Sequence, residues 1–169
     1  TDDVIVSPPI FTLAGNGSQV IRVGLRRGPD AQRELSYRLF LQEVPAPPKP
    51  GQAGVQMALR IGVPVFVAPA QPLPHRLEWR AVREPSGELS VVAENRGNLH
   101  VQVIGFKLVG PGEAPQEIAK NTRSAYILPG QRQQWRLKPD AAVATGAKLS
   151  VRAQTDAGDL AGDLALDPP

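Results

Sequence analysis

Apolar and polar residues alternate over the longest run in residues 54–69, GVQMALRIGVPVFVAP. Successive side chains of a strand point to opposite faces of a sheet, so this alternation predicts a single β-strand. Strands usually run about 5–6 residues, and this pattern is far longer. We expect the end of the strand, Val63 to Val67, to pack in the protein's own core. We expect its start, Val55 to Leu59, to present a ridge of apolar side chains to a partner. The ridge face carries only apolar side chains, those of Val55, Met57, Leu59, Ile61, Val63, Val65 and Val67.

Shorter segments of the same kind recur along the chain between turn residues. The 18 prolines and 16 glycines separate them, as in proteins built of many short strands. No stretch has a sustained helical period, so we expect an all-β fold. The turn Asn16-Gly17 accepts positive φ angles, and residues 157–164 suit a hairpin with a polar edge. The remaining strands are expected at residues 4–6, 19–26, 36–44, 77–82, 89–94, 100–109, 116–120, 125–128, 133–137 and 148–153.

The apolar phase changes once within a strand. Residues 100–109 begin with Val101 and Val103 in one phase and continue with Ile104, Phe106 and Leu108 in the other. An extra residue in one strand shifts the alternation in this way, so we expect a β-bulge near Gly105.

Proline-rich segments divide the chain into two parts. Residues 45–54 form a loop that joins two strands of the first part as a wide hairpin. Residues 70–75 read as a linker, so we expect one domain at 1–69 and a second at 76–169. Strands every 8–12 residues or so in the second part are typical of a β-sandwich.

Composition excludes several classes of protein. The formal charge is +3, the arginines are scattered, and two Trp and two Tyr offer no aromatic series for stacking bases, so we expect no nucleic-acid partner. No run approaches the ~20 apolar residues of a membrane span, which predicts no membrane insertion. The chain has no cysteine, so disulfides, thiol catalysis and zinc–thiolate sites are excluded. His75 and His100 have no nucleophile setting and are interpreted as surface residues; we expect no enzyme, no metal and no cofactor.

Several motifs together resemble one known family. In the first part these are residues 7–13, 19–23, 37–45 and 59–69, with the proline-rich loop between the last two. In the second part they are residues 94–98 with 100–105, and 127–130 with 133–137. Their order and spacing are similar to those of the periplasmic pilus chaperones, the PapD-like family, over nearly the whole chain.

The resemblance implies a fold, a function and a binding site. The fold would be two immunoglobulin-like β-sandwich domains set at an angle around a cleft, the first incomplete. The function would be a periplasmic chaperone that binds and caps pilus or fimbrial subunits by donor-strand complementation and delivers them to an outer-membrane usher. Its strand would fill the subunit's groove with Val55, Met57 and Leu59, with Ile61 deeper and Val44 beside them.

One departure from the family concerns the cleft. Better-known members place a lysine there for the subunit's terminal carboxylate, and the matching position is Pro64. The sequence around it looks more like the archaic branch of the family. A cation is still needed beside a buried carboxylate, and Arg38 is the first candidate, with Arg60 the second. The alternative for Arg38 is an arginine that snorkels to solvent.

A second departure concerns the first domain, which has room for about four strands. The first strands of the family's N-terminal domain are missing, so a half-sandwich would leave its apolar face open. We therefore expect either a truncated or processed piece, or a face covered by another copy, for example by strand exchange. Two other functions stay open: a generic immunoglobulin-like structural or adhesion module, and a truncated chaperone without subunit binding.

Overall fold

The computed structural model is all-β, which confirms the predicted fold class. It describes residues 1–169 except 46–54, 56, 112–115, 142, 145 and 169, and within these residues no helix is long and apolar enough to cross a bilayer. The strands of the first part are β1 (Val4–Ser7), β2 (Arg22–Leu25), β3 (Leu35–Gln42) and β4 (Arg60–Val67). Those of the second part are β5 (Leu77–Arg83), β6 (Leu89–Asn95), β7 (Val101–Val109), β8 (Glu117–Asn121), β9 (Ala125–Ile127), β10 (Arg132–Leu137), β11 (Lys148–Thr155) and β12 (Gly158–Asp167).

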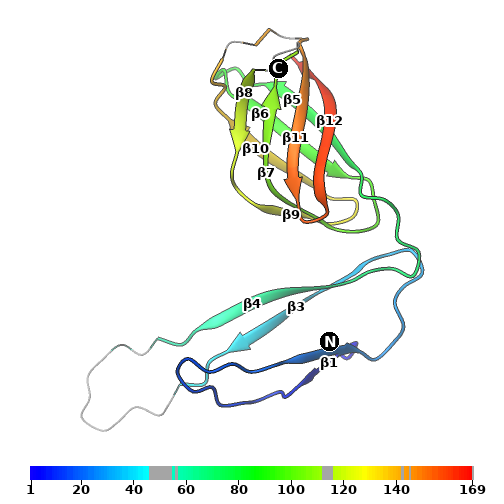
Figure 1. Ribbon diagram of the computed structural model, residues 1–169, viewed down its shortest axis with the longest axis vertical. Helices are drawn as coiled ribbons and strands as arrows, with labels where there is room; N and C mark the ends of the chain where they lie inside the picture. The colour runs from blue at the N-terminus through cyan, green and yellow to red at the C-terminus, as the bar shows by residue number, and fades with distance from the viewer. Residues whose placement is uncertain (46–54, 56, 112–115, 142, 145, 169) are drawn as a thin grey trace.

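The first part consists of two separate antiparallel pairs. Strand β1 pairs with β2, and β3 pairs with β4 in a long ribbon that points away from the second part (Figure 1). The Tyr37 hydroxyl donates to the Asp3 carboxylate at 3.1 Å and ties the ribbon to the β1–β2 pair. The predicted turn at Asn16 is present, with a φ of 61° and a hydrogen bond from Gly17 N to Ala14 O of 2.9 Å.

Strand β4 is shorter than the predicted strand at 54–69. It begins at Arg60, opposite Gln42 at the end of β3, and ends at Val67 opposite Leu35. One further backbone bond, from Glu43 N to Leu59 O at 2.8 Å, extends the pairing. The described residues before Leu59 have no partner strand, which is why their alternating sequence does not form a ladder. Residues 46–54 of the predicted loop and strand lie outside the described residues.

The second part is a β-sandwich whose two layers are joined by one strand. Strands β10, β6 and β5 form one layer, and β11, β7, β8 and β9 form the other (Figure 1). Strand β12 pairs antiparallel with β11 from Gly158 to Ala165 and then parallel with β5 at Leu166 and Asp167. The expectation of a hairpin within residues 157–164 is wrong, because residues 158–164 lie within the single strand β12, which is the second strand of the β11–β12 hairpin and meets β5 only at Leu166 and Asp167.

The buried core of the described residues lies in the sandwich. Trp79 and Phe106 have ring centroids 5.1 Å apart, and Trp135 lies 5.0 Å from Phe106, so three aromatic rings fill the space between the layers. The aliphatic side chains around them come from both layers, as expected for a closed sandwich. They include Leu89, Val91, Val101, Val103, Leu108, Ile127, Leu149, Val151 and Leu166.

The predicted bulge in β7 is confirmed. Gln154 of β11 pairs with Gly105, whereas the next residue, Thr155, pairs with Val103, so Ile104 is the extra residue. Ile104 is consequently exposed, and the expectation that it shares the buried phase of Phe106 is wrong. Gly105 is required by close contact, since a Cβ there would lie 2.9 Å from the Asn121 carbonyl oxygen.

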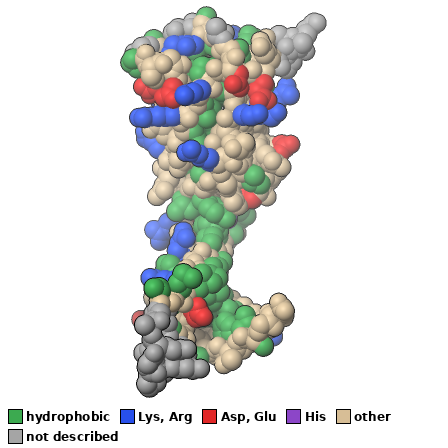
Figure 2. All heavy atoms as spheres, turned by 90° about the vertical axis from the view of Figure 1, so that its left-hand side faces the viewer, with side chains coloured by type: hydrophobic (Ala, Val, Ile, Leu, Met, Phe, Trp, Pro, Cys, Tyr) green, Lys and Arg blue, Asp and Glu red, His purple; other side chains and the backbone are tan. Residues whose placement is uncertain are grey.

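The first part has almost no buried core. Of its described residues only Glu34, Leu35 and Pro69 are buried, and all three lie at the base of the β3–β4 ribbon. Val63 is 39% exposed, and Val65 and Val67 are half-buried, so the expectation that Val63 to Val67 pack in a core is wrong. Figure 2 shows the consequence, with hydrophobic side chains prominent over the neck and lower part and charged side chains concentrated on the upper part. The apolar face of the ribbon lacks a complete second layer.

Replacing Gly105 with alanine should destabilise the sandwich, because the added methyl group would push against the backbone of β8. We expect a loss of about 1–3 kcal/mol in the free energy of unfolding, measured by denaturant titration. Gly110→Ala is the matched control, since its Cβ would make only ordinary contacts, with the Ile118 side chain at 3.6 Å and the Gln116 carbonyl oxygen at 3.8 Å. Equal stability of the two variants would contradict the packing account of the bulge.

Candidate functional site

The apolar ridge predicted from the sequence is exposed and its exposure is graded. The exposed fraction falls from 94% at Val55 and 89% at Met57 to 62% at Leu59, 46% at Ile61 and 39% at Val63. Beyond Val63 the same face is half-buried at Val65 and Val67. One end of the segment is thus held by the protein, while the other presents apolar side chains to solvent. Val44, at the end of the neighbouring segment, is 86% exposed and adds to this surface.

The backbone beside the ridge is also available. Among the described residues, β4 pairs with β3 alone, so its other edge carries unpaired N–H and C=O groups. An exposed apolar edge of this kind is a template for pairing with another strand. Nothing but Pro64 interrupts the row of donors along β4, and proline is tolerated on an edge strand. The site therefore combines an apolar face with a backbone edge.

The opposite face of the ribbon carries the two candidate cations. The register pairs Gln42 with Arg60, Phe40 with Gly62 and Arg38 with Pro64, and paired residues of an antiparallel ladder share a face. This face also carries Phe66, whose ring contacts the sandwich. Arg38 and Arg60 therefore lie on the side of the ribbon that is directed toward the sandwich at its base.

The two arginines differ in their surroundings. The Arg60 guanidinium carbon lies 4.2 Å from the centre of the Phe40 ring, within the range of a cation–π contact. The Arg38 side chain passes beside Gly62, where a Cβ would lie 3.4 Å from its Cδ. Among the described residues neither arginine has a carboxylate within 4.0 Å, and both side chains are exposed. Exposure is compatible with both interpretations of Arg38, a carboxylate anchor or a solvated side chain.

The base of the ribbon is fastened to the sandwich by the turn after β6. Asn95 is buried and holds this turn, since its amide nitrogen donates to Leu99 O at 2.7 Å and to Ile127 O at 2.8 Å. The Asn98 amide nitrogen then donates to Gln32 O at 2.8 Å and to Gln71 O at 2.9 Å. One side chain thereby ties the segment that enters β3 and the segment that leaves β4.

The segment that enters β3 has its own turn. The backbone N–H groups of Gln32 and Arg33 donate to Asp30 Oδ1 at 3.0 and 2.8 Å. These hydrogen bonds stabilise the carboxylate and lower the pKa of Asp30 below its usual value. The turn places Glu34 directly after it, where it meets the sandwich.

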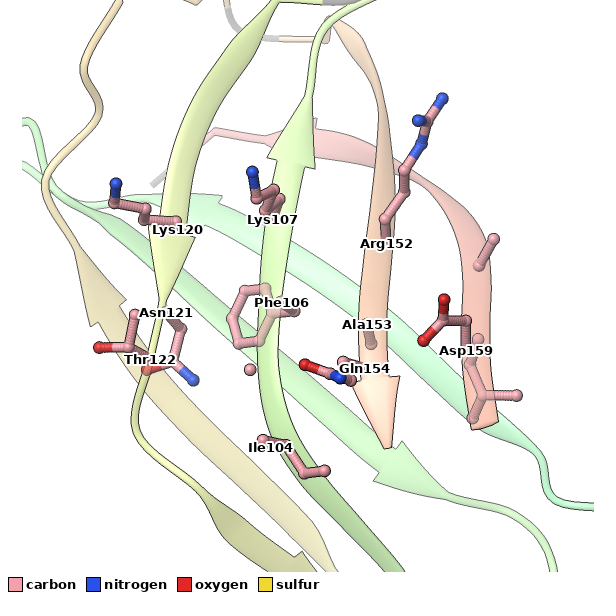
Figure 3. Close-up of a pocket in the computed structure, with 13 residues that line it drawn as sticks. Ile104, Phe106, Lys107, Lys120, Asn121, Thr122, Arg152, Ala153, Gln154 and Asp159 are labelled. Atoms are coloured by element: carbon pink, nitrogen blue, oxygen red, sulfur yellow. The ribbon is translucent and has the colours of Figure 1, made fainter. Parts of the chain in front are cut away.

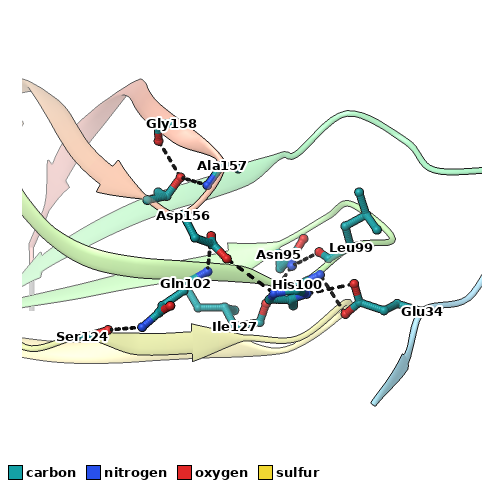
Figure 4. Close-up of polar contacts among 11 residues, drawn as sticks. Glu34, Asn95, Leu99, His100, Gln102, Ser124, Ile127, Asp156, Ala157 and Gly158 are labelled. Atoms are coloured by element: carbon teal, nitrogen blue, oxygen red, sulfur yellow. Dashed lines mark hydrogen bonds and ion pairs between the residues drawn. The ribbon is translucent and has the colours of Figure 1, made fainter. Parts of the chain in front are cut away.

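His100 is a second fastening point, and its interpretation as a surface residue is wrong. Its ring lies between the Glu34 and Asp156 carboxylates and stacks on Phe66 of β4 (Figure 4). His75 is also half-buried, with a buried Nδ1. Sequence reasoning missed Glu34 and Asp156 because they lie 66 and 56 residues from His100 in the chain. The turn motif at residues 94–98, directly before His100, was the only available signal.

The sandwich has concave surfaces of its own, away from the ridge. One pocket of about 630 Å³ lies on the outer face of β8, β7, β11 and β12, beside the bulge (Figure 3). Lys107 and Lys120 on this face both pair with Glu117, and the Lys107 hydrogen bond lowers the pKa of Glu117. In the part of the chain that the structure describes, no group of three or more His, Cys, Asp or Glu could hold a metal ion.

The comparisons with known proteins agree with the geometry of the ribbon. Residues 1–72 match the family model of the pili and flagellar-assembly chaperone, PapD N-terminal domain. A search of curated proteins found no match. The match covers the β1–β2 pair, the β3–β4 ribbon and the start of the linker.

Proposed function

We propose that this chain is a periplasmic chaperone that binds a pilus subunit by donor-strand complementation and delivers it to an outer-membrane usher. The observation that carries the proposal is the exposed ridge from Val55 to Ile61, which lies beside an unpaired strand edge. An ordinary core strand would bury the same side chains. The matching family model supports the class of chaperone.

The mechanism follows from what a strand-deficient subunit lacks. Such a subunit has an apolar groove with unpaired backbone groups on both lips, which would aggregate if left open. The segment before and within β4 would add its backbone to these lips, while Val55, Met57 and Leu59 fill the vacant pockets. Ile61 would lie deeper, and Val44 would pack beside them.

The energy of this contact suits a transient complex. Burying four such side chains is worth roughly 6–12 kcal/mol, at about 1.5–3 kcal/mol each, before the cost of ordering the segment is subtracted. The described residues before Leu59 form no strand, so binding has to order them. A competing strand with a better fit can therefore replace the chaperone when the subunit reaches the usher. We also propose that the chain belongs to the archaic branch of the family, because the sequence around Pro64 looks more like that branch.

A carboxylate at the end of the subunit would need a cation at the base of the ribbon. Arg38 suits this role best because it lies opposite Pro64, nearer the sandwich, and has a free guanidinium among the described residues. Arg60 lies nearer the open end and already contacts Phe40. We therefore propose Arg38 as the residue that binds the carboxylate, with Arg60 as the second candidate.

The alternative functions are less well supported. A generic immunoglobulin-like module would use the long strand as core, yet the apolar residues from Val55 to Val63 are exposed. A chaperone remnant without subunit binding would share the fold and is distinguished only by a binding experiment. The first prediction below separates all three.

The open apolar face also supports self-association. Leu39, Leu41, Ile61 and Val63 share the face that carries Tyr37, and Ile61 and Val63 are exposed. A second copy could cover this face by pairing ribbons or exchanging strands. Such a dimer would compete with a subunit for Ile61, so we propose it as the resting form of the chaperone.

Met57→Asp should abolish co-purification with a strand-deficient pilus subunit, because a buried carboxylate would face the subunit's apolar pocket. Its own unfolding midpoint should stay unchanged, since Met57 is 89% exposed. Ala58→Asp, which adds the same charge in the opposite phase, is the matched control and should retain the subunit. Loss of the fold in Met57→Asp would favour the module, and retention of the subunit would contradict the donor segment. A wild-type chain that captures no subunit would favour the remnant.

Arg38→Gln should weaken subunit binding about 10–100-fold, the value of losing a charged hydrogen bond worth about 1.5–3 kcal/mol. Calorimetric titration would measure the dissociation constant with a subunit that ends in a free carboxylate and with one that ends in an amide. The wild-type chain should prefer the carboxylate, and Arg38→Gln should not. If Arg60→Gln removes the preference instead, the anchor is Arg60; if neither does, there is no arginine anchor.

Size-exclusion chromatography with light scattering should give the mass of a dimer for the free chain. Ile61→Asp should shift the mass toward the monomer, because the charge would face the covered surface. Gln42→Asp, an exposed position on the other face, is the control and should remain dimeric. A well-folded wild-type monomer over the whole concentration range would contradict the self-association.

A further inference from the structure

The His100 ring is held at both edges by carboxylates. Its Nδ1 lies 2.9 Å from Glu34 Oε2, and its backbone N–H donates to Glu34 Oε1 at 3.0 Å. Its Nε2 lies 3.4 Å from Asp156 Oδ2 (Figure 4). Asp156 lies in the turn between β11 and β12 and is held against β7, since its Oδ1 accepts the Gln102 N–H at 2.8 Å. The three groups come from the entry to the ribbon, the start of β7 and that turn.

The ring can donate a hydrogen bond to both carboxylates only when it is protonated. A neutral imidazole has one N–H, so it can donate to one carboxylate while its other nitrogen directs a lone pair at the second. The imidazolium ion donates from both nitrogens, and a hydrogen bond between two charged groups is roughly twice as strong as a neutral one. Histidine is the side chain whose ordinary titration falls between about pH 5 and pH 8.

The face of the ring connects the proton to the ribbon. Phe66 of β4 stacks on His100 with centroids 3.6 Å apart and an interplanar angle of 18°. A positive charge on the imidazole adds a cation–π attraction to this stack. Protonation therefore strengthens three contacts at once: two with carboxylates and one with the strand that carries the ridge.

The other titratable groups near His100 are few among the described residues. Tyr126 of β9 lies 5.9 Å away, centroid to centroid, and the segment before β5 contributes His75, which lines a pocket of about 300 Å³ together with His100. Strand β4 contributes no charge at this point, since Phe66 is the residue in contact. His75 is the group whose titration has to be separated from that of His100.

We propose that His100 is a proton-dependent latch that fixes the β3–β4 ribbon to the sandwich. In the protonated state the ribbon holds one direction, and in the neutral state it keeps the Asn98 contacts at its base but varies in direction. The latch rests on the contacts of this chain and holds whether or not the ridge binds a pilus subunit. If a cleft lies between the ribbon and the sandwich, the latch gives that cleft one defined shape under acidic conditions.

Distances between spin labels test the latch directly in the full chain. The protein has no native cysteine, so Gln42→Cys on the ribbon and Lys148→Cys on the sandwich label two exposed positions selectively. Pulsed electron resonance would measure the distance distribution between about pH 5 and pH 8. At acidic pH we expect one narrow peak, and at alkaline pH the loss of that peak.

Three variants assign the effect to His100. His100→Arg keeps the charge at every pH and should keep the narrow peak, whereas His100→Gln is neutral and should lack it. His75→Gln should behave as the wild-type chain. Asp156→Asn keeps the acceptor for Gln102 and removes the charge, so it should reduce the narrow peak even if the histidine variants fail to fold. A wild-type distribution that does not change with pH, or a response that disappears in His75→Gln, would overturn the latch.

Discussion

A ribbon of two strands cannot bury its apolar face and satisfy both of its edges at the same time. Strands β3 and β4 each use one edge to pair with the other, and Ile61 and Val63 on their apolar face remain exposed. Almost all burial in the described first part is confined to the base of the ribbon, at Glu34, Leu35 and Pro69. The surplus of apolar surface and unpaired backbone is the feature from which the proposed function follows.

The sandwich supplies what the ribbon lacks, a fixed point. Its closed core is independent of the ribbon, because the buried cluster contains only residues from Trp79 onward. The turn after β6 then uses polar contacts to hold the ribbon: Asn98 binds the segments on both sides, and His100 binds Glu34 and Phe66. A ribbon held at one end by such contacts explains why exposure rises steadily from Val67 to Val55. It also explains how a long apolar edge can be presented without collapsing on its own molecule.

Patterns that depend on near neighbours in the sequence were predictable. Alternation located the strands, the phase change located the bulge beside Gly105, and Asn16-Gly17 located a turn. The first residue of β4 was not predictable from the sequence, because a strand can begin only where a partner strand is present. Strand β3 ends at Gln42, which pairs with Arg60, and β4 therefore begins at Arg60. The joining of two layers by β12 and the surroundings of His100 depend on residues far apart in the chain, and the pattern of a single sequence does not show which of these residues come together. Burial at Val63 was overestimated because alternation shows which face is apolar but not whether a second layer covers it.

Amide hydrogen exchange of the chain with and without a strand-deficient pilus subunit tests the central claim most directly. The account predicts that the subunit protects the backbone of Met57 to Ile61, which belongs to the exposed segment and the open edge of β4. It predicts little change on the outer face of the sandwich around Lys107 and Arg152. Binding that leaves Met57 to Ile61 unprotected, with protection on the sandwich instead, would show that the ribbon does not donate a strand.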